Sequence, residues 1–124
     1  MASMDASKDR AVERLLSLAK HRGLPEIVLS TTDGDPALKL RDNTIAVVKE
    51  AGVLYLPCPL GMKEVLLESA PDVYYQTEHY RGWPGLLIRL DVIGDEELTL
   101  RLEDAWRYRA PKRLAAGLPQ APQR

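Results

Sequence analysis

The stretch between residues 37 and 57 constrains the fold of this chain more than any other. Two leucines, Leu38 and Leu40, alternate there with two cations, Lys39 and Arg41. A period of two is typical of a strand with one buried and one solvent-facing side. We therefore expect both leucines to be buried and both cations to be exposed, because a shift of one residue would turn the cations into the core.

Turn sequences divide the same stretch into three strands. Asp42-Asn43 predicts a two-residue turn, since both side chains tolerate positive φ or bond to the turn backbone. Residues 44–49 are then the return strand, and Glu50-Ala51-Gly52 turns the chain into a third strand at 53–57. Pro57-Cys58-Pro59 ends the pairing, because proline has no amide donor. The stretch thus predicts an antiparallel meander.

Two amphipathic segments flank the strands. Residues 5–20 predict a helix that Gly23 and Pro25 end, since glycine suits the left-handed C-terminal position and proline cannot continue a helix. Residues 96–110 predict a second helix. The apolar stripes are Val12, Leu15, Leu16 and Ala19 in the first helix and Leu98, Leu102, Ala105 and Trp106 in the second. We expect an α+β sandwich with both helices on one face of an antiparallel sheet.

Shorter segments complete the predicted order. We expect strands at residues 26–30, 73–75 and 86–92, a polar loop at 31–36 and a short helix at 62–69. One side of the short helix carries Met62, Val65, Leu66 and Ser69, and one face of the last strand carries Leu86, Ile88, Leu90 and Val92. Residues 1–4 and 117–124 are expected to be mobile, since Gly117, Pro119 and Pro122 oppose a helix.

Size and composition indicate one small globular domain. The chain has 124 residues, of which 45% are hydrophobic and 28% charged. Its single cysteine excludes an internal disulfide and favours a reducing, cytoplasmic setting. No apolar run approaches the ~18 residues of a membrane span, and from the polar start we expect no secretory signal. With a net charge of −1, bulk charge gives no attraction to a polyanion or a membrane.

Cys58 and an acidic ridge are the first candidates for chemistry. A helix after Cys58 could activate its thiol, but a lone cysteine that follows a strand is more often a small core residue. Asp5, Asp9 and Glu13 share one helix face, which interleaved cations and the helix dipole explain without a metal. The two histidines have no zinc-motif spacing. We expect no metal, no cofactor and no catalytic constellation.

The segment 77–84 carries the strongest binding signal. It contains Gly82 and Pro84, which are typical of a loop, and it holds His79, Tyr80, Arg81 and Trp83. Aromatic and basic side chains in one loop can stack on bases and contact phosphates. The alternative is that Tyr80 and Trp83 close the edge of the core, since both residue types commonly have one buried and one wet end.

A basic surface is the second candidate. If their strands share one sheet, Lys39, Arg41 and Arg89 point to the side opposite the buried leucines. The end of the chain adds basic residues without acids, among them Lys112 and Arg113. Together with the loop arginine these cations would form a positive patch on a nearly neutral protein. The alternative is an ordinary solvated sheet face and tail.

Four motifs follow one another in a specific order. They are Gly-Asp-Pro-Ala-Leu-Lys-Leu-Arg at 34–41, Leu-Pro-Cys-Pro at 56–59, Pro-Asp-Val-Tyr-Tyr-Gln-Thr-Glu-His-Tyr-Arg-Gly-Trp-Pro at 71–84 and Leu-Glu-Asp-Ala-Trp-Arg-Tyr-Arg-Ala-Pro-Lys-Arg-Leu at 102–114. In these motifs, and from about Leu15 to Leu114 as a whole, the chain resembles the MmcQ/YjbR family. The resemblance implies a bacterial protein with a frataxin-like helix–sheet–helix fold and the family's usual description, a predicted DNA-binding protein.

These features favour two functions from different classes. The first is a non-enzymatic domain that binds DNA weakly and without sequence preference, through the basic sheet face and the aromatic loop, because no segment predicts a recognition helix. The second is a protein- or small-ligand-binding module in which the loop and the Tyr55 side of the sheet form an aromatic pocket. Salt dependence distinguishes them, because phosphate contacts release counterions.

Overall fold

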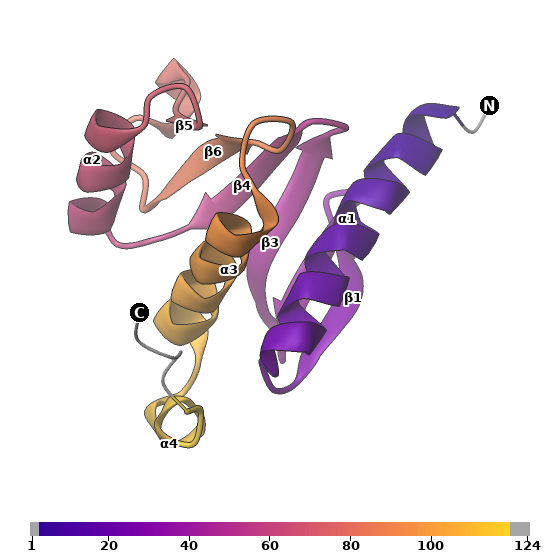
Figure 1. Cartoon of the computed structure of the whole chain (residues 1–124), viewed down its shortest axis with the longest axis vertical. Coiled ribbons are helices and arrows are strands. Elements are labelled where there is room, and N and C mark those ends of the chain that lie inside the picture. Colours follow the sequence, from indigo (N-terminus) through magenta and orange to yellow (C-terminus); the bar gives the residue numbers. More distant parts are fainter. Residues whose placement is uncertain (1–2, 120–124) are drawn as a thin grey trace.

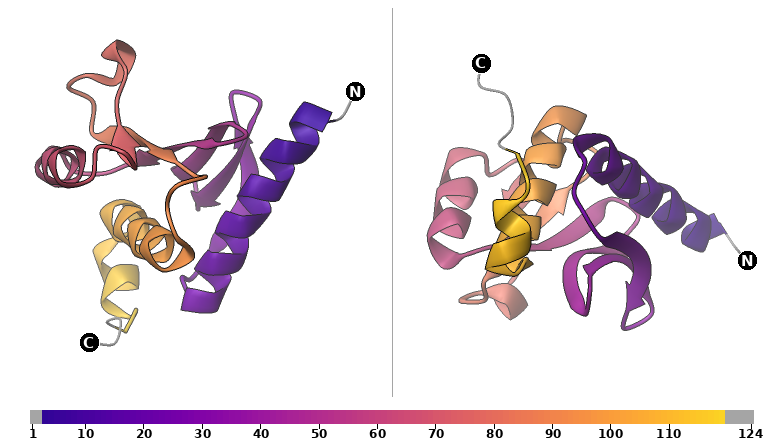
Figure 2. Two further views of the ribbon diagram at one scale, coloured as in Figure 1. Left: turned by 45° about the horizontal axis from the view of Figure 1, so that its top comes forward. Right: turned by 90° about the horizontal axis from the view of Figure 1, so that it is seen from below.

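The computed structural model describes residues 3–119, which form one antiparallel sheet with helices. In chain order the elements are α1 (Ser3–Arg22), β1 (Ile27–Thr32), β2 (Asp35–Leu40), β3 (Asn43–Glu50), β4 (Val53–Pro57), α2 (Leu60–Ser69), β5 (Tyr74–Tyr75), the 3-10 helix η1 (Glu78–Tyr80), β6 (Gly85–Arg89), α3 (Asp95–Arg109) and α4 (Lys112–Ala116). The strand order is β1-β2-β3-β4-β6-β5, and every neighbouring pair is antiparallel. Helices α1 and α3 lie together against one face of the sheet (Figures 1 and 2). The predicted α+β sandwich is confirmed.

The core lies between that face and the two helices. Leu38 and Leu40 of β2 are fully buried there, as their alternation predicts, together with most of the apolar stripes of α1 and α3. Trp106 is also fully buried, and its indole donates a 2.9 Å hydrogen bond to the main-chain oxygen of Pro25, so its buried N–H is satisfied. Gly23 ends α1 in the left-handed conformation, at φ 85°.

The segment expected to be a loop at residues 31–36 is instead a tight hairpin turn. Strand β1 continues through Thr32, which pairs with Asp35 at the start of β2. Between them, Asp33 and Gly34 have φ of 51° and 86°, the left-handed conformation typical of a two-residue type I′ turn. The expectation of a loop is wrong because this Asp-Gly pair can reverse the chain alone, so the two strands extend up to it.

The next turn is formed by Arg41 and Asp42, one residue earlier than the Asp42-Asn43 expected from the sequence. Leu40 pairs with Asn43 across the turn, after a register shift beside Lys39. Arg41 has φ 57°, and its guanidinium donates bonds of 2.7 and 3.1 Å to the Glu26 carboxylate. Arg41 therefore lies at the end of the sheet and not on its face, whereas Lys39 is half-buried and not exposed.

Neither α1 nor α3 covers the second face of the sheet, yet the centre of this face is apolar. One row of side chains runs across four strands in register: Ala37, Val47, Tyr55 and Leu87. All of them except the tyrosine are buried. The β1–β2 hairpin curls over this face (Figure 2), and the hydroxyls of Thr32 and Thr44 lie 3.1 Å apart although β2 separates their strands. The sheet therefore does not present the open basic face that the sequence predicts.

Burial in two elements does not follow the shared sides that the sequence indicates. In α2 the buried residues are Lys63 and Leu66, whereas Val65 is 62% exposed. The helix is turned so that the lysine reaches main-chain oxygens in the following loop. In the last strand Leu87 is buried on the second face, and Val92 lies beyond the end of β6, where the chain leaves the sheet, and is 50% exposed.

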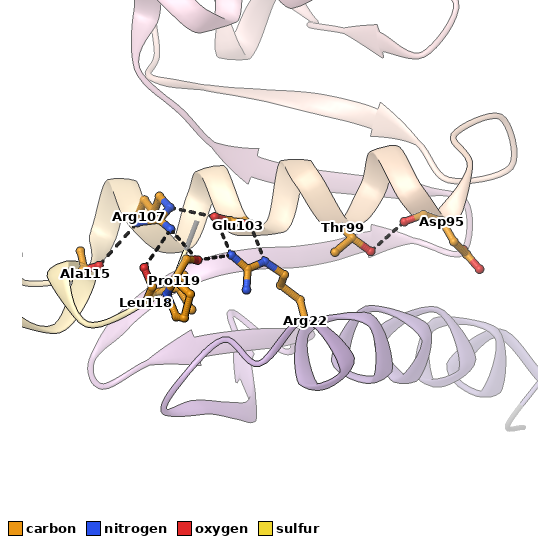
Figure 3. A network of polar contacts seen from close by, with 8 residues as sticks. All are labelled: Arg22, Asp95, Thr99, Glu103, Arg107, Ala115, Leu118 and Pro119. Atoms are coloured by element: carbon orange, nitrogen blue, oxygen red, sulfur yellow. Dashed lines mark hydrogen bonds and ion pairs between the residues drawn. The ribbon is translucent and has the colours of Figure 1, made fainter. Parts of the chain in front are cut away.

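The C-terminal segment packs on α1 and α3, where two guanidinium groups bind one buried carboxylate and also contact main-chain oxygens of the segment (Figure 3). Glu103 is 7% exposed and accepts hydrogen bonds from Arg22, at 2.8 and 3.1 Å, and from Arg107, at 2.9 Å. Arg22 also donates a 2.6 Å bond to the main-chain oxygen of Pro119, and Leu118 is buried. The predicted fraying is therefore wrong at residues 117–119.

The predicted mobility of residues 1, 2 and 120–124 concerns positions outside the described residues. Ser3 and Met4, also expected to be mobile, belong to α1. Among the helices formed by residues 3–119, none combines the length and apolar composition needed to cross a lipid bilayer.

Glu103→Gln should lower the free energy of unfolding by about 2 kcal/mol at neutral pH, because two guanidiniums lose their shared buried counter-charge. Burial alone would raise the pKa of Glu103, but the hydrogen bonds from Arg22 and Arg107 hold it below its usual 4.5. The folded state thus binds fewer protons than the unfolded state, so this stabilisation is present above about pH 5 and is lost at lower pH. Urea denaturation at pH 7 and pH 3 measures both effects.

Glu64→Gln, on the exposed side of α2, is the matched control and should leave the stability unchanged at both pH values. If the gap between wild type and Glu103→Gln stayed the same at pH 3, the ion-pair network would not have the role assigned to it.

Candidate functional site

Four rings gather where the segment 77–84, the aromatic loop, crosses the second face of the sheet. This aromatic cluster consists of Tyr55 from β4 and His79, Tyr80 and Trp83 from the loop. Tyr55 and Tyr80 stack with their ring centroids 5.2 Å apart, and Tyr80 meets His79 and Trp83 in edge-to-face contacts. The His79 and Trp83 rings lie 5.7 Å apart at 30°. The structure thus brings the predicted aromatic residues together on one surface.

The sequence left two alternatives for the aromatic loop, a stacking surface or closure of the core edge, and each applies to different residues. Tyr80 is half-buried on the Tyr55 ring and closes the apolar centre of the second face. Trp83 is 51% exposed, and His79 is exposed beside it. Tyr80 is therefore the support, and the other two rings face solvent on top of it. A solvent-facing tryptophan in a fixed position offers a flat surface on which another ring can stack.

Gly85 allows the Tyr55 ring to lie flat on the sheet. A Cβ atom at residue 85 would fall on the Tyr55 ring, so a larger residue would displace the tyrosine and the loop above it. Burial in this position raises the pKa of the Tyr55 hydroxyl. The floor of the aromatic cluster is thus strand backbone.

A buried lysine behind the aromatic loop fixes its shape. Lys63 of α2 is 3% exposed, and its ammonium donates 2.8 Å hydrogen bonds to the main-chain oxygens of Tyr80 and Trp83. Loss of hydration lowers the pKa of this ammonium, and the two charge-assisted bonds offset part of that cost. The turn is closed by a 3.0 Å bond from Trp83 N to Tyr80 O, with Gly82 at φ 82°. The loop is therefore held by the buried ammonium and by the hydrogen bond within its own turn.

Lys63 is the functional residue that the sequence analysis missed. A lysine followed by Glu64 in an amphipathic helix indicates a solvated position, since lysine is rarely buried. Its spacing of three residues from the buried Leu66 places it on the inner side of α2. That spacing was the available signal, but it does not reveal that carbonyl oxygens from a distant loop would meet the ammonium.

A cavity of about 260 Å³ opens beside the aromatic cluster on the second face. Its lining residues are Lys49, Glu50, Val53, Tyr75, Thr77, Tyr80 and Leu87. Two aromatic and two aliphatic side chains give it apolar surface, and the carboxylate and hydroxyl groups can fix an orientation. Its volume suits a single flat ring system.

Two of the predicted cations lie near this cavity and the aromatic cluster. The Arg89 guanidinium lies over the Tyr75 ring, 4.0 Å from its centroid, a cation–π contact that leaves its hydrogen-bond donors available. Arg81 pairs with Glu78 at 3.1 Å. Both side chains of that pair are largely exposed, 67% and 82%, so the ion pair is weak and a phosphate can compete for Arg81.

The other predicted cations are elsewhere. Lys39 and Arg41 lie beside the start of β3. Arg89 pairs with Val53 beside the β3–β4 turn, at the other end of β3. The length of β3 separates the two groups by about 20 Å. The last two, Lys112 and Arg113, belong to α4, which extends beyond α3 on the helix side (Figure 1). The predicted single basic surface is therefore not formed, because Arg41 is in a turn and the length of β3 separates it from Arg89.

Cys58 is a core residue and not an activated thiol. It is fully buried, and burial raises the pKa of its thiol to about 11, so the thiolate is scarce at neutral pH. On the proposed acidic ridge, Asp9 and Glu13 are exposed on α1. Among the described residues, no group of three or more His, Cys, Asp or Glu side chains is arranged to hold a metal ion.

Comparison with known proteins finds partial relatives. Uncharacterised proteins of Mycobacterium tuberculosis and Mycobacterium bovis are 39% identical to this chain over 54 residues, which are 44% of the chain and 42% of each relative. The matched part thus spans less than half the length of the curated relatives. No family model matches the chain, and no solved structure matches it. Any activity therefore has to be argued from the geometry of the site.

Lys63→Met should loosen the aromatic loop while leaving the sheet intact, because two carbonyl oxygens lose their donor. The cost of about 1–3 kcal/mol for unsatisfied buried acceptors corresponds to amide exchange about 5- to 150-fold faster in the loop. Exchange at Tyr80, Arg81 and Trp83, whose amides are hydrogen-bonded within the loop, measures this directly.

Lys20→Met, at an exposed position of α1, is the control for loss of a lysine charge and should leave these rates unchanged. Loop amides that exchange at the wild-type rate in Lys63→Met would show that the buried ammonium does not hold the loop.

Proposed function

We propose that this domain binds single-stranded DNA, with the exposed His79–Trp83 face of the aromatic cluster as the surface on which bases stack. The observation that carries the proposal is the pair of solvent-facing rings, 5.7 Å apart, on a loop that a buried ammonium holds in place. Aromatic side chains on a fixed support bind bases of any sequence, because every base has a flat π-face.

The rigidity of the loop favours binding. Stacking contributes about 1–3 kcal/mol per base, and a flexible loop would lose part of this to the entropy of ordering. The two bonds from Lys63 and the stacking of Tyr80 on Tyr55 fix the loop before any ligand arrives. Trp83 and His79 can then contact a base without rearrangement.

The positions of the cations favour a single strand over a duplex. Arg81 belongs to the aromatic loop itself, and Arg89 lies over Tyr75 on the same face of the sheet, so each can contact a phosphate of a strand that crosses the rings. Lys39 and Arg41 at the far end of β3, and Lys112 and Arg113 on α4, are too dispersed to follow a duplex together with them. With two phosphate contacts and a net charge of −1, binding is weak and sensitive to salt.

The same proposal includes membership of the MmcQ/YjbR family, whose motifs the chain resembles, and a location in the bacterial cytoplasm. The mycobacterial relatives and the single buried cysteine are consistent with that setting. In this role the domain is a binding module without catalytic residues.

A second candidate function is the binding of a small aromatic molecule, which the cavity of about 260 Å³ beside the cluster favours. Tyr75, Tyr80 and Leu87 would contact the ring, and Glu50 and Thr77 its polar edge. Binding of this kind responds little to salt, whereas binding through phosphates weakens steeply as salt is raised.

Trp83→Ala should weaken binding to a short fluorescein-labelled oligothymidine by about tenfold at low salt, since a stacked base is lost. Arg81→Ala should weaken it and reduce the slope of log K against log salt by about 0.7, the value for one phosphate contact on a single strand. Fluorescence anisotropy over a salt series measures both. The duplex of the same length should bind more weakly than the single strand.

Arg113→Ala removes the same charge from exposed α4 and should change neither the affinity nor the slope. A wild-type protein that binds neither strand form at low salt would refute the proposal, and an equal loss in Arg113→Ala would move the binding surface away from the aromatic loop.

A further inference from the structure

Strand β1 forms an edge of the sheet, at the end remote from the aromatic loop. In the strand order it is the first member, and within residues 3–119 it pairs with β2 alone. Its six residues, Ile-Val-Leu-Ser-Thr-Thr, have high β propensity and contain no charge or proline. Natural edge strands usually carry a lysine, a proline or a bulge that prevents further pairing. This edge has none of them.

Alternate residues of β1 direct their main-chain groups away from β2. The two-residue turn at Asp33-Gly34 closes on Thr32 and Asp35, so that pair exchanges both hydrogen bonds. The same holds at every second residue before it. Ile27, Leu29 and Thr31 therefore turn their N–H and C=O groups to the outer edge, where no hydrogen bond from the described residues meets them.

A cleft of about 500 Å³ lies beside this edge, between β1 and α1. Val12 from α1 and Leu29 and Pro36 from the hairpin contribute its apolar lining. Leu29 is 55% exposed there, although it is a large apolar residue in a strand. An apolar side chain entering from outside would cover it.

The cleft is acidic on the side of α1. Asp9 and Glu13, one helical turn apart, line it and are exposed, and neither has an ion pair with a described side chain. Lys8 also lines the cleft, but its ammonium lies 2.8 Å from the Asp35 carboxylate, which also pairs with Lys49. The charges left for a ligand are therefore the two carboxylates, and they select a cationic group.

We propose that β1 and this cleft form a docking site for an extended segment of a partner protein whose every second residue, the set that faces α1, is apolar or basic. The segment adds a strand to the sheet by pairing with Ile27, Leu29 and Thr31. Its apolar side chains cover Leu29, and its cations meet Asp9 and Glu13. A second copy of this chain is the weaker occupant, because its own β1 offers no cation to the two carboxylates.

The probe is an acetylated and amidated Lys-Thr-Val-Thr-Lys-Thr peptide, which carries its valine and both lysines on one face when extended, added to the full chain. Amide exchange at Leu29 and Thr31 should slow by about tenfold or more at saturation, whereas Val28, Ser30 and Thr32, already bonded to β2, should not change. A peptide with glutamate in place of each lysine should bind at least about fivefold more weakly.

The double variant Asp9→Lys with Glu13→Lys, at exposed helix positions, tests the charge complementarity. It should weaken binding of the lysine peptide by about tenfold and strengthen that of the glutamate peptide. Three results would overturn the proposal: no change at Leu29 and Thr31, equal affinity of the two peptides, or free protein that self-associates with these amides already protected. Because the site is remote from Trp83, the outcome is independent of DNA binding.

Discussion

The two long helices cover only one face of a six-stranded sheet, and this constraint shapes the whole of the other face. An apolar row that includes Val47, Tyr55 and Leu87 crosses it and has to be shielded from water. One half of the face is closed by the curl of the β1–β2 hairpin, with Thr32 against Thr44. The other half is closed by the aromatic loop. That loop therefore shields apolar surface of the sheet whether or not a ligand is bound.

This double role explains the arrangement of the rings. Tyr80 stacks on Tyr55 and shields the apolar row from water. The turn that brings Tyr80 there leaves Trp83 and His79 facing solvent. An apolar residue in place of Lys63 would close the core at a lower desolvation cost. The ammonium instead fixes two carbonyl oxygens and hence the path of the turn. We infer that the lysine is used for the geometry of the loop more than for stability.

The layered fold was predictable because its signals are local. Alternation at Leu38 and Leu40 and helical spacing around Leu102 each report one buried side. The features that the sequence did not predict correctly depend on partners distant in sequence or on backbone conformation. Lys63 and Glu103 are buried only because carbonyl oxygens or guanidiniums from other segments meet them, and no period shows this. Likewise, the cations around Arg41 could not be assigned to one face until the turn was placed one residue earlier.

The two tryptophans differ in a way that allows the central claim, stacking of a base on Trp83, to be tested directly. Trp106 is fully buried, whereas Trp83 is 51% exposed, so only the latter can touch a ligand. Titration of the wild type and of Trp83→Phe with single-stranded DNA at low salt should quench tryptophan emission saturably in the wild type and leave that of Trp83→Phe unchanged. Bound DNA, detected by anisotropy, with unquenched wild-type emission would contradict the account.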